Sequence, residues 1–97
     1  MAEVIHHQLK QALATIHAIA HPVRVKILEH VLKKQPLLAR DIYNTLQLSP
    51  AIASQQLRIL KDAGLLRSKR RAKEVWYEPN IPKLKRVLLA AYTYCAD

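Results

Sequence analysis

Glycine occurs only once in this chain of 97 residues, at Gly64. Tight β-hairpin turns often require glycine, so a chain with a single glycine is poorly suited to an all-β fold. Leu, Ile, Val and Ala supply most of the 51% of residues that are apolar, and many of them recur at helical spacing. We therefore expect one mainly α-helical domain over residues 1–97, because so short a chain forms one core and not two.

The N-terminal half of the chain has the pattern of three helices. Apolar residues three and four positions apart predict a first helix over residues 3–20. A second helix follows with Pro22 in its first turn, and the basic and proline residues of segment 33–36 end it. A short third helix fits residues 39–46.

A fourth helix has clear signals at both of its ends. Ser49 is a good N-cap, Pro50 is a good first helical residue, and Gly64 is a natural C-terminal stop. The side chains expected to face the core from this helix are Ala53, Leu57 and Leu60.

The remaining chain has the pattern of a β-hairpin followed by one more helix. Two short strands are expected at Leu65–Arg70 and Glu74–Glu78, with a basic turn at residues 71–73. Asn80 is a suitable cap for a last helix over residues 81–97. The predicted order is four helices, two strands and a fifth helix, which is mainly α with a small β-hairpin.

The chain is strongly basic. Sixteen Lys and Arg residues against seven Asp and Glu residues give a formal net charge of +9. Such a charge favours a polyanionic partner, and double-stranded DNA is the first candidate. The sequence has no apolar run long enough to span a membrane and no apolar signal core near Met1, so we expect a cytoplasmic protein.

Two short helices joined by a tight turn and followed by a basic hairpin have the plan of a winged helix-turn-helix. Residues 39–63 would form the helix-turn-helix and residues 65–79 the wing. A Gln side chain can form paired hydrogen bonds with an adenine edge, and cations can bind phosphates. The expected DNA-contacting residues are Ser49, Ala51, Ile52, Ser54, Gln55, Gln56, Arg58 and Lys61 on the helix and Lys69, Arg70, Arg71 and Lys73 on the wing.

Three stretches of the sequence resemble the ArsR/SmtB family of repressors. Residues 20–28 follow the family's A-x-P-x-R-x-x-I-L opening. Residues 48–66 resemble its L-S-x-x-x-x-S-x-H-L-x-x-L-x-x-A-G-L-V stretch, and residues 75–77 match the end of its wing. Gln56 stands where the family often has His, and Ala72 stands where the wing turn often has Gly. We expect these departures to alter sequence preference or wing shape rather than the fold.

The resemblance implies a repressor that binds an operator in double-stranded DNA as a homodimer and releases it when a metal or another signal binds. The dimer would form through the first and last helices, here residues 1–20 and 81–97. The apolar stripes of these helices support that expectation, because a lone monomer would expose them. The stripe residues expected at the interface are Leu9, Leu13, Ile16, Leu84, Leu88 and Tyr92.

The signal that such a protein would sense is not evident. Segment 36–42 has no Cys-x-Cys pair and residues 83–97 have no His, so two metal sites of the family lack their ligands, and we expect no cofactor and no metal. His17 and His21 are four residues apart, a spacing that can hold a metal but more often lines a helix junction. Cys95 has no partner for an internal disulfide, and it could be either a redox switch or a packed side chain.

Functions other than DNA binding are less favoured by the residues of this chain. The sequence shows no nucleophile–His–acid set, no glycine-rich phosphate loop and no evident carboxylate pair, so we do not expect an enzyme. An amphipathic protein of the membrane surface and a winged helix module that binds another protein both remain open. Salt-sensitive, sequence-specific binding to duplex DNA would separate the expected regulator from both.

Overall fold

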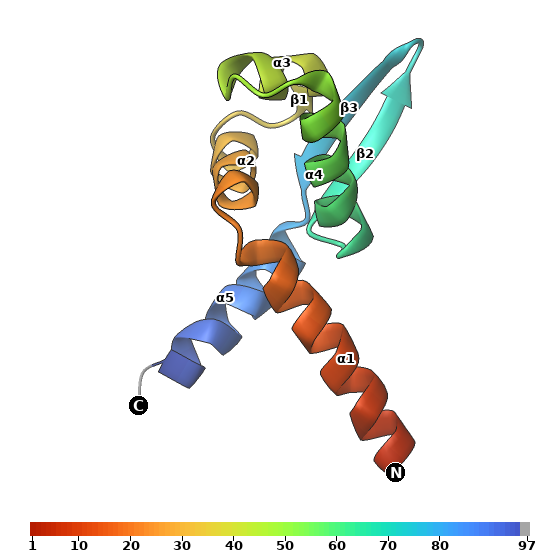
Figure 1. Ribbon diagram of the computed structural model, residues 1–97, viewed down its shortest axis with the longest axis vertical. Helices are drawn as coiled ribbons and strands as arrows, with labels where there is room; N and C mark the ends of the chain where they lie inside the picture. Colours follow the sequence, from red (N-terminus) through yellow and green to blue (C-terminus); the bar gives the residue numbers. More distant parts are fainter. Residues whose placement is uncertain (96–97) are drawn as a thin grey trace.

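The fold comes from a computed structural model that describes residues 1–95 and the side chains of residues 1–90. The elements in these residues follow the order α1 (Ala2–Ile19), α2 (Pro22–Lys33), β1 (Leu37–Leu38), α3 (Ala39–Thr45), α4 (Pro50–Asp62), β2 (Leu66–Arg71), β3 (Glu74–Pro79) and α5 (Ile81–Cys95) (Figure 1). The predicted helices and hairpin strands are confirmed, with bounds that differ by at most one residue; the predicted end of the last helix at residue 97 lies outside the described residues.

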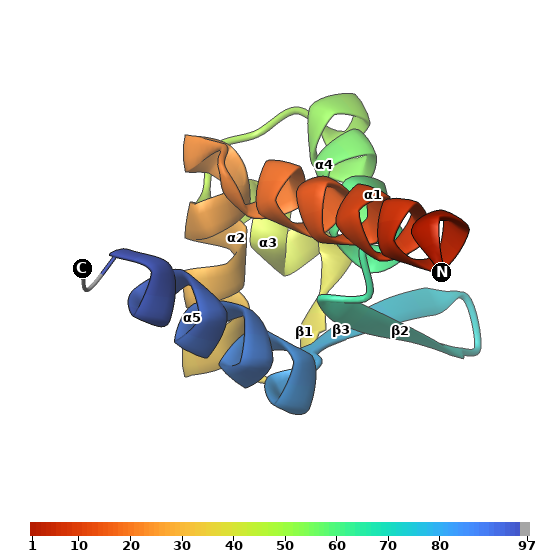
Figure 2. The ribbon, with the colours of Figure 1, turned by 90° about the horizontal axis from the view of Figure 1, so that it is seen from below.

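The molecule has a head and two projecting helices (Figure 1). The head contains α2, α3, α4 and the small sheet (Figure 1). The whole molecule, with the projecting helices, measures 45 × 28 × 22 Å. Seen from below, α1 and α5 run across the base of the head, and the β2–β3 hairpin extends outward on one side (Figure 2). The two helices that leave the head are therefore available for contacts outside it.

Local capping fixes where α2 and α4 begin. The Nδ1 atom of His21 accepts a hydrogen bond from the backbone N–H of Val23 at 3.3 Å. The hydroxyl of Ser49 accepts one from the backbone N–H of Ile52 at 3.2 Å, which confirms the predicted N-cap. Both helices have proline at the first position, where its missing N–H and fixed φ suit the first turn.

Gly64 ends α4, as predicted, and does so through a Schellman motif. Its φ is 76°, a left-handed conformation that glycine adopts without the steric cost of a Cβ atom. The backbone N–H of Gly64 donates to the carbonyl of Lys61 at 2.9 Å, and that of Leu65 donates to Leu60 at 3.0 Å. The chain can therefore turn directly from α4 into β2.

The sheet is antiparallel with the strand order β1-β3-β2. Strand β1 was not predicted; its Leu37 pairs with Tyr77 and its Leu38 pairs with Trp76. β1 is only two residues long, so it cannot show the alternation by which a strand is recognised in a sequence. The sheet joins the helix-turn-helix to the hairpin, because β1 leads directly into α3.

One apolar core holds the head together. Ala53, Leu57 and Leu60 of α4 are all at most 2% exposed, which confirms the predicted inner face of this helix. Leu84 of α5 is also buried, with 6% of its surface exposed. Its expected place in a dimer interface is therefore wrong, since this side chain packs in the core of its own chain. The arrangement as a whole is a winged helix-turn-helix, with α3 and α4 as the helix pair and β2 and β3 as the wing.

Candidate nucleic-acid interface

The outer face of α4 is exposed and mostly polar. Opposite the buried inner face, the exposed residues are Ala51, Ile52, Ser54, Gln55, Arg58 and Lys61. Gln56 differs from them because it is half-buried and its Oε1 atom is buried without a hydrogen-bond partner. The structure thus brings six of the predicted DNA-contacting residues onto accessible surface of one helix.

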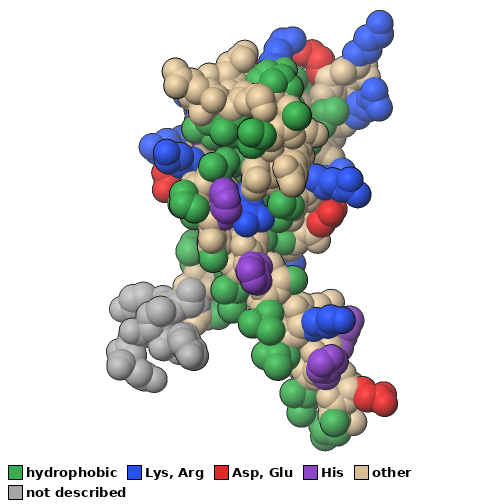
Figure 3. Space-filling view, viewed as in Figure 1, with side chains coloured by type: hydrophobic (Ala, Val, Ile, Leu, Met, Phe, Trp, Pro, Cys, Tyr) green, Lys and Arg blue, Asp and Glu red, His purple; other side chains and the backbone are tan. Residues whose placement is uncertain are grey.

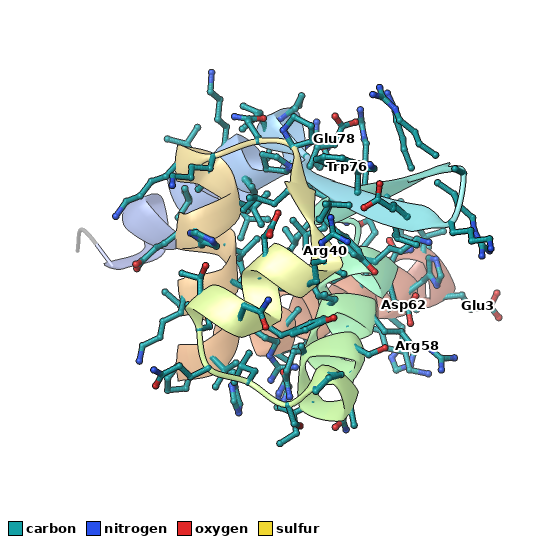
Figure 4. The ribbon with its side chains drawn as sticks, turned by 90° about the horizontal axis from the view of Figure 1, so that it is seen from above. Glu3, Arg40, Arg58, Asp62, Trp76 and Glu78 are labelled. Carbon is teal, nitrogen blue, oxygen red and sulfur yellow. The ribbon has the colours of Figure 1, made fainter. Side chains whose placement is uncertain are left out.

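The outer face of α4 carries little net charge. Arg58 and Asp62 are one helical turn apart, with Nε and Oδ2 separated by 3.8 Å. Figure 4 shows both side chains pointing away from the body of the protein. The pair is highly exposed, so its contribution to stability is small. Its acid nevertheless offsets the charge of Arg58 and leaves hydrogen-bonding groups, rather than cations, as the main feature of this face.

The wing separates its cations onto two faces. β2 and β3 pair in register from Leu66 with Pro79 to Arg71 with Glu74, and side chains alternate between the faces of a strand. One face carries Arg67, Lys69 and Arg71 together with Glu74, Trp76 and Glu78. The other carries Ser68 and Arg70 together with Val75 and Tyr77.

This alternation distinguishes Lys69 from Arg70. The Nζ atom of Lys69 lies 3.8 Å from the carboxylate of Glu78, whereas the cross-strand partner of Arg70 is the apolar Val75. Burial raises the pKa of Tyr77 on the same face as Arg70 above its ordinary value of 10.0, so that the phenol is neutral at physiological pH. Arg70 therefore has no acid directly across the hairpin, while part of the charge on the opposite face is compensated.

The turn of the wing consists of Ala72 and Lys73. Both side chains are exposed, and Lys73 lies beside the paired residues Arg71 and Glu74. Ala72 has a φ of 56°, a left-handed conformation that is costly for a residue with a Cβ atom. The predicted cations of the wing thus gather near one exposed tip. Figure 3 shows Lys and Arg side chains over the wing and alongside α4.

Arg40 forms an ion pair that was not predicted from the sequence. Its guanidinium lies 3.1 Å from the carboxylate of Glu74, and this ion pair joins the start of α3 to the wing. Figure 4 shows Arg40 between α3 and the sheet. No local signal in the sequence points to this ion pair, because it follows from the pairing of β1 with β3: continuing the register of Leu38 with Trp76 by two residues brings Arg40 opposite Glu74.

Two side chains at the start of α5 hold the C-terminal end of α4. The amide of Asn80 donates to the carbonyl of Gly64 at 2.8 Å, and its oxygen accepts from the backbone N–H of Lys83 at 3.4 Å. The Nζ atom of Lys83 donates to the carbonyl of Ala63 at 2.6 Å. A cation at this position complements the negative end of the helix dipole. The orientation of the outer face of α4 therefore depends on its attachment to α5.

The sequence that forms this surface matches a known protein family. Residues 21–68, from the N-cap of α2 into β2, match the family described as "Bacterial regulatory protein, arsR family". The chain belongs to the arsR family. A comparison with curated proteins finds no match to the sequence.

Solved structures similar to this ArsR-family chain share its fold over nearly the whole length. NolR from Sinorhizobium fredii is 23% identical, with a TM-score of 0.78 over 98% of this chain and 94% of NolR. The transcriptional repressor PagR of Bacillus anthracis is 27% identical, with a TM-score of 0.72 over 88% of this chain and 98% of PagR. The homodimeric winged helix-turn-helix DNA-binding domain of Mb0332 from Mycobacterium bovis is 20% identical, with a TM-score of 0.79 over 92% of this chain and 82% of that domain.

The histidines of this ArsR-family chain do not form a ligand cluster in the described residues. His17 is an exposed residue of α1, whereas His21 lies beyond the end of that helix and caps α2 through its Nδ1 atom. The two therefore do not share a helical face. Among the described side chains, those of residues 1–90, no group of three or more His, Cys, Asp and Glu residues could hold a metal. The side chains of Tyr92 and Cys95 lie outside those described.

The long helix α1 carries an exposed apolar face. The large apolar side chains of α1 with more than half of their surface exposed are Val4, Ile5, Leu9, Leu13 and Ile16, at 52–59%. Figure 3 shows apolar side chains along one edge of α1 and basic or histidine side chains along another. Leu88 of α5 is exposed as well, at 60%. None of the described helices has the length and apolar character needed to cross a membrane.

Proposed function

We propose that this ArsR-family protein represses transcription by binding, as a homodimer, an imperfect palindromic operator in double-stranded DNA. The observation that carries the proposal is the polar, exposed outer face of α4 beside a cationic wing, in a chain with a net charge of +9. A helix with such a face can enter the major groove, and the wing can contact the backbone of the same duplex. A protein with this task works where the chromosome is, in the cytoplasm.

In the proposed complex the two parts of the interface have different tasks. Ser54, Gln55 and the other outer residues of α4 read base edges, because reading a base requires directed donors and acceptors. Lys69, Arg70, Arg71 and Lys73 attract phosphates, which requires only charge. Ser49 and Gln56 flank the base-reading surface, since the hydroxyl of Ser49 accepts the capping bond and Gln56 is half-buried.

A second copy of the chain completes the proposed unit. The exposed apolar face of α1 would be costly to leave in water, and the domain of Mb0332, which is similar in fold, is described as homodimeric. Pairing through α1 and α5 places two α4 helices on one duplex. Major grooves on one side of the DNA recur about every 34 Å, so a twofold dimer favours a palindromic site.

The test compares Gln55→Ala with the wild type on duplexes selected from a randomised pool. The variant is expected to lose about 1–3 kcal/mol on the selected duplex and little on a scrambled duplex. Gln11→Ala is the matched control, because Gln11 is an exposed glutamine of α1 rather than of α4.

Two results would overturn the proposal. One is the absence of any selected duplex together with binding to anionic lipid vesicles, which would favour the membrane-surface alternative. The other is an equal loss of affinity for selected and scrambled duplexes in Gln55→Ala, which would remove base reading from α4.

A further inference from the structure

Ile52 is an apolar side chain for which the head provides no packing site. It lies in the first turn of α4 with 48% of its surface exposed, although isoleucine is among the residues most often buried. Ile59 lies two turns later on the same flank of the helix and packs against the core. Ile52 does not belong to that core cluster, so folding of the head does not account for an isoleucine at this position.

The exposed face of α1 does not account for Ile52 either. The N-terminal end of α4 lies at the top of the head beside α3, whereas α1 leaves from the base of the head (Figure 1). Ile52 and the apolar face of α1 are therefore separated by the length of α4. The nearest functional surface is the outer face of α4 itself.

Ile52 lies at a position in α4 from which a side chain can contact the edges of DNA bases. In helix-turn-helix proteins the N-terminal residues of the second helix contact base edges. Gln55 follows Ile52 by three residues, and side chains at this spacing are about 5–6 Å apart on a helix surface. Since base pairs are stacked about 3.4 Å apart, the two side chains would reach base pairs one or two steps from each other.

Only one group on the major-groove edge of a base pair is apolar, and it is the C5 methyl of thymine. We propose that Ile52 recognises this methyl group on a thymine one or two base pairs from the base that Gln55 binds. The inference rests on the proposed function, because it requires α4 to lie in the major groove. It assigns to each half-site a thymine that is selected by apolar contact rather than by hydrogen bonds.

The test removes the two contacting groups separately. A duplex selected by the wild type is resynthesised with deoxyuridine in place of each thymine in turn, which removes the C5 methyl and leaves base pairing unchanged. At one position in each half-site we expect about a fourfold loss of affinity, the effect of losing one buried methyl-sized group. Substituting both half-sites should give about a sixteenfold loss, and thymines elsewhere should be insensitive.

Ile52→Ala then distinguishes a direct contact from an effect of deoxyuridine on DNA shape. The variant should bind the thymine duplex less tightly and should no longer respond to deoxyuridine at the sensitive position. Gln55→Ala is the control, because it should weaken binding while keeping the response to deoxyuridine. Circular dichroism and a thermal melt show whether Ile52→Ala is folded, as expected for an exposed position.

The outcomes separate this inference from the proposed function. If no duplex is selected, the proposed function fails and the inference fails with it. If a duplex is selected and Gln55→Ala loses specificity, but the deoxyuridine scan is flat or Ile52→Ala keeps the full response, the inference alone is wrong.

Discussion

Ala72 is a residue whose backbone conformation suits glycine better than alanine. Its φ of 56° at the tip of the wing costs an alanine about 1 kcal/mol or more, and glycine removes that cost while adding freedom to the unfolded chain. We expect Ala72→Gly to raise the free energy of unfolding by a few tenths to about 1 kcal/mol. Urea denaturation, followed by circular dichroism, measures the change.

The control for this substitution is Ala51→Gly. Ala51 is exposed like Ala72 but lies in the helix α4, where glycine is less favourable than alanine by up to about 1 kcal/mol. The two substitutions should therefore act in opposite directions. A loss of stability in both variants would mean that the turn of the wing is not strained by Ala72.

Single residues with a local role were the most predictable part of the structure. Ser49, Pro50 and Gly64 act on backbone groups within a few residues of themselves, so the sequence around them contains everything needed to assign their roles. The conformation of Ala72 was harder to predict from the sequence, because an alanine does not indicate a left-handed turn. The only indication of this conformation was that the family often has glycine at this position of the wing turn.

At the scale of elements, the attachment of α4 to α5 through Asn80 is expected to stabilise the fold. Asn80→Ala removes the hydrogen bond to Gly64 and the cap at Lys83, and should lower the free energy of unfolding by about 1–2 kcal/mol. The exposed Asn44 of α3 provides the control, since Asn44→Ala should change stability by less than about 0.5 kcal/mol. Equal effects of the two substitutions in chemical denaturation would contradict a structural role for Asn80.

The wing allows a prediction about charge that depends on its strand register. Arg70→Ala should reduce the log–log salt dependence of binding to a scrambled duplex by about one unit. Lys69→Ala should reduce it less, because Lys69 already lies 3.8 Å from Glu78. Binding of both variants across a salt series measures the slopes. A larger change for Lys69→Ala would show that the other face of the wing meets the DNA.

The elements themselves were predictable where their patterns are long. The helices α1, α2 and α4 have repeated apolar positions and distinct capping residues, and the hairpin has aromatic and β-branched residues. Strand β1 and the ion pair between Arg40 and Glu74 were not predictable, because each depends on residues far apart in the sequence. The distribution of the wing cations over two faces also requires the register, which composition does not contain.

At the scale of the whole molecule, the exposed face of α1 predicts how the proposed dimer can be dissociated. Leu13 is 52% exposed, and burying the remaining half of a leucine side chain contributes about 1 kcal/mol in each protomer, a gain that a charged side chain at this position would replace with a desolvation cost. Leu13→Glu should therefore sediment as a monomer at micromolar concentration, where the wild type should be a dimer. Gln11→Glu changes charge on another side of the same helix and should leave the dimer intact. A stable wild-type monomer would contradict the assembly itself.

The apolar excess in the first and last helices indicates the proposed assembly, but the share of each side chain could not be predicted from the sequence. Leu84 and Leu88 occupy successive turns of α5, and the sequence treats them alike. In the structure Leu84 is 6% exposed and Leu88 is 60% exposed, because only the start of α5 lies against the head. Which leucines serve the core and which are left for a partner depends on where the helix leaves the head.

Dimerisation through the exposed face of α1 would also make operator binding depend steeply on the concentration of the protein in the cell. In the proposed homodimer, when chains are scarce relative to the dissociation constant, the amount of dimer varies with the square of the chain concentration. Halving the copy number then lowers the amount of dimer about fourfold. A growing cell that stopped making the protein would release its operators abruptly, within few divisions, rather than in proportion to dilution.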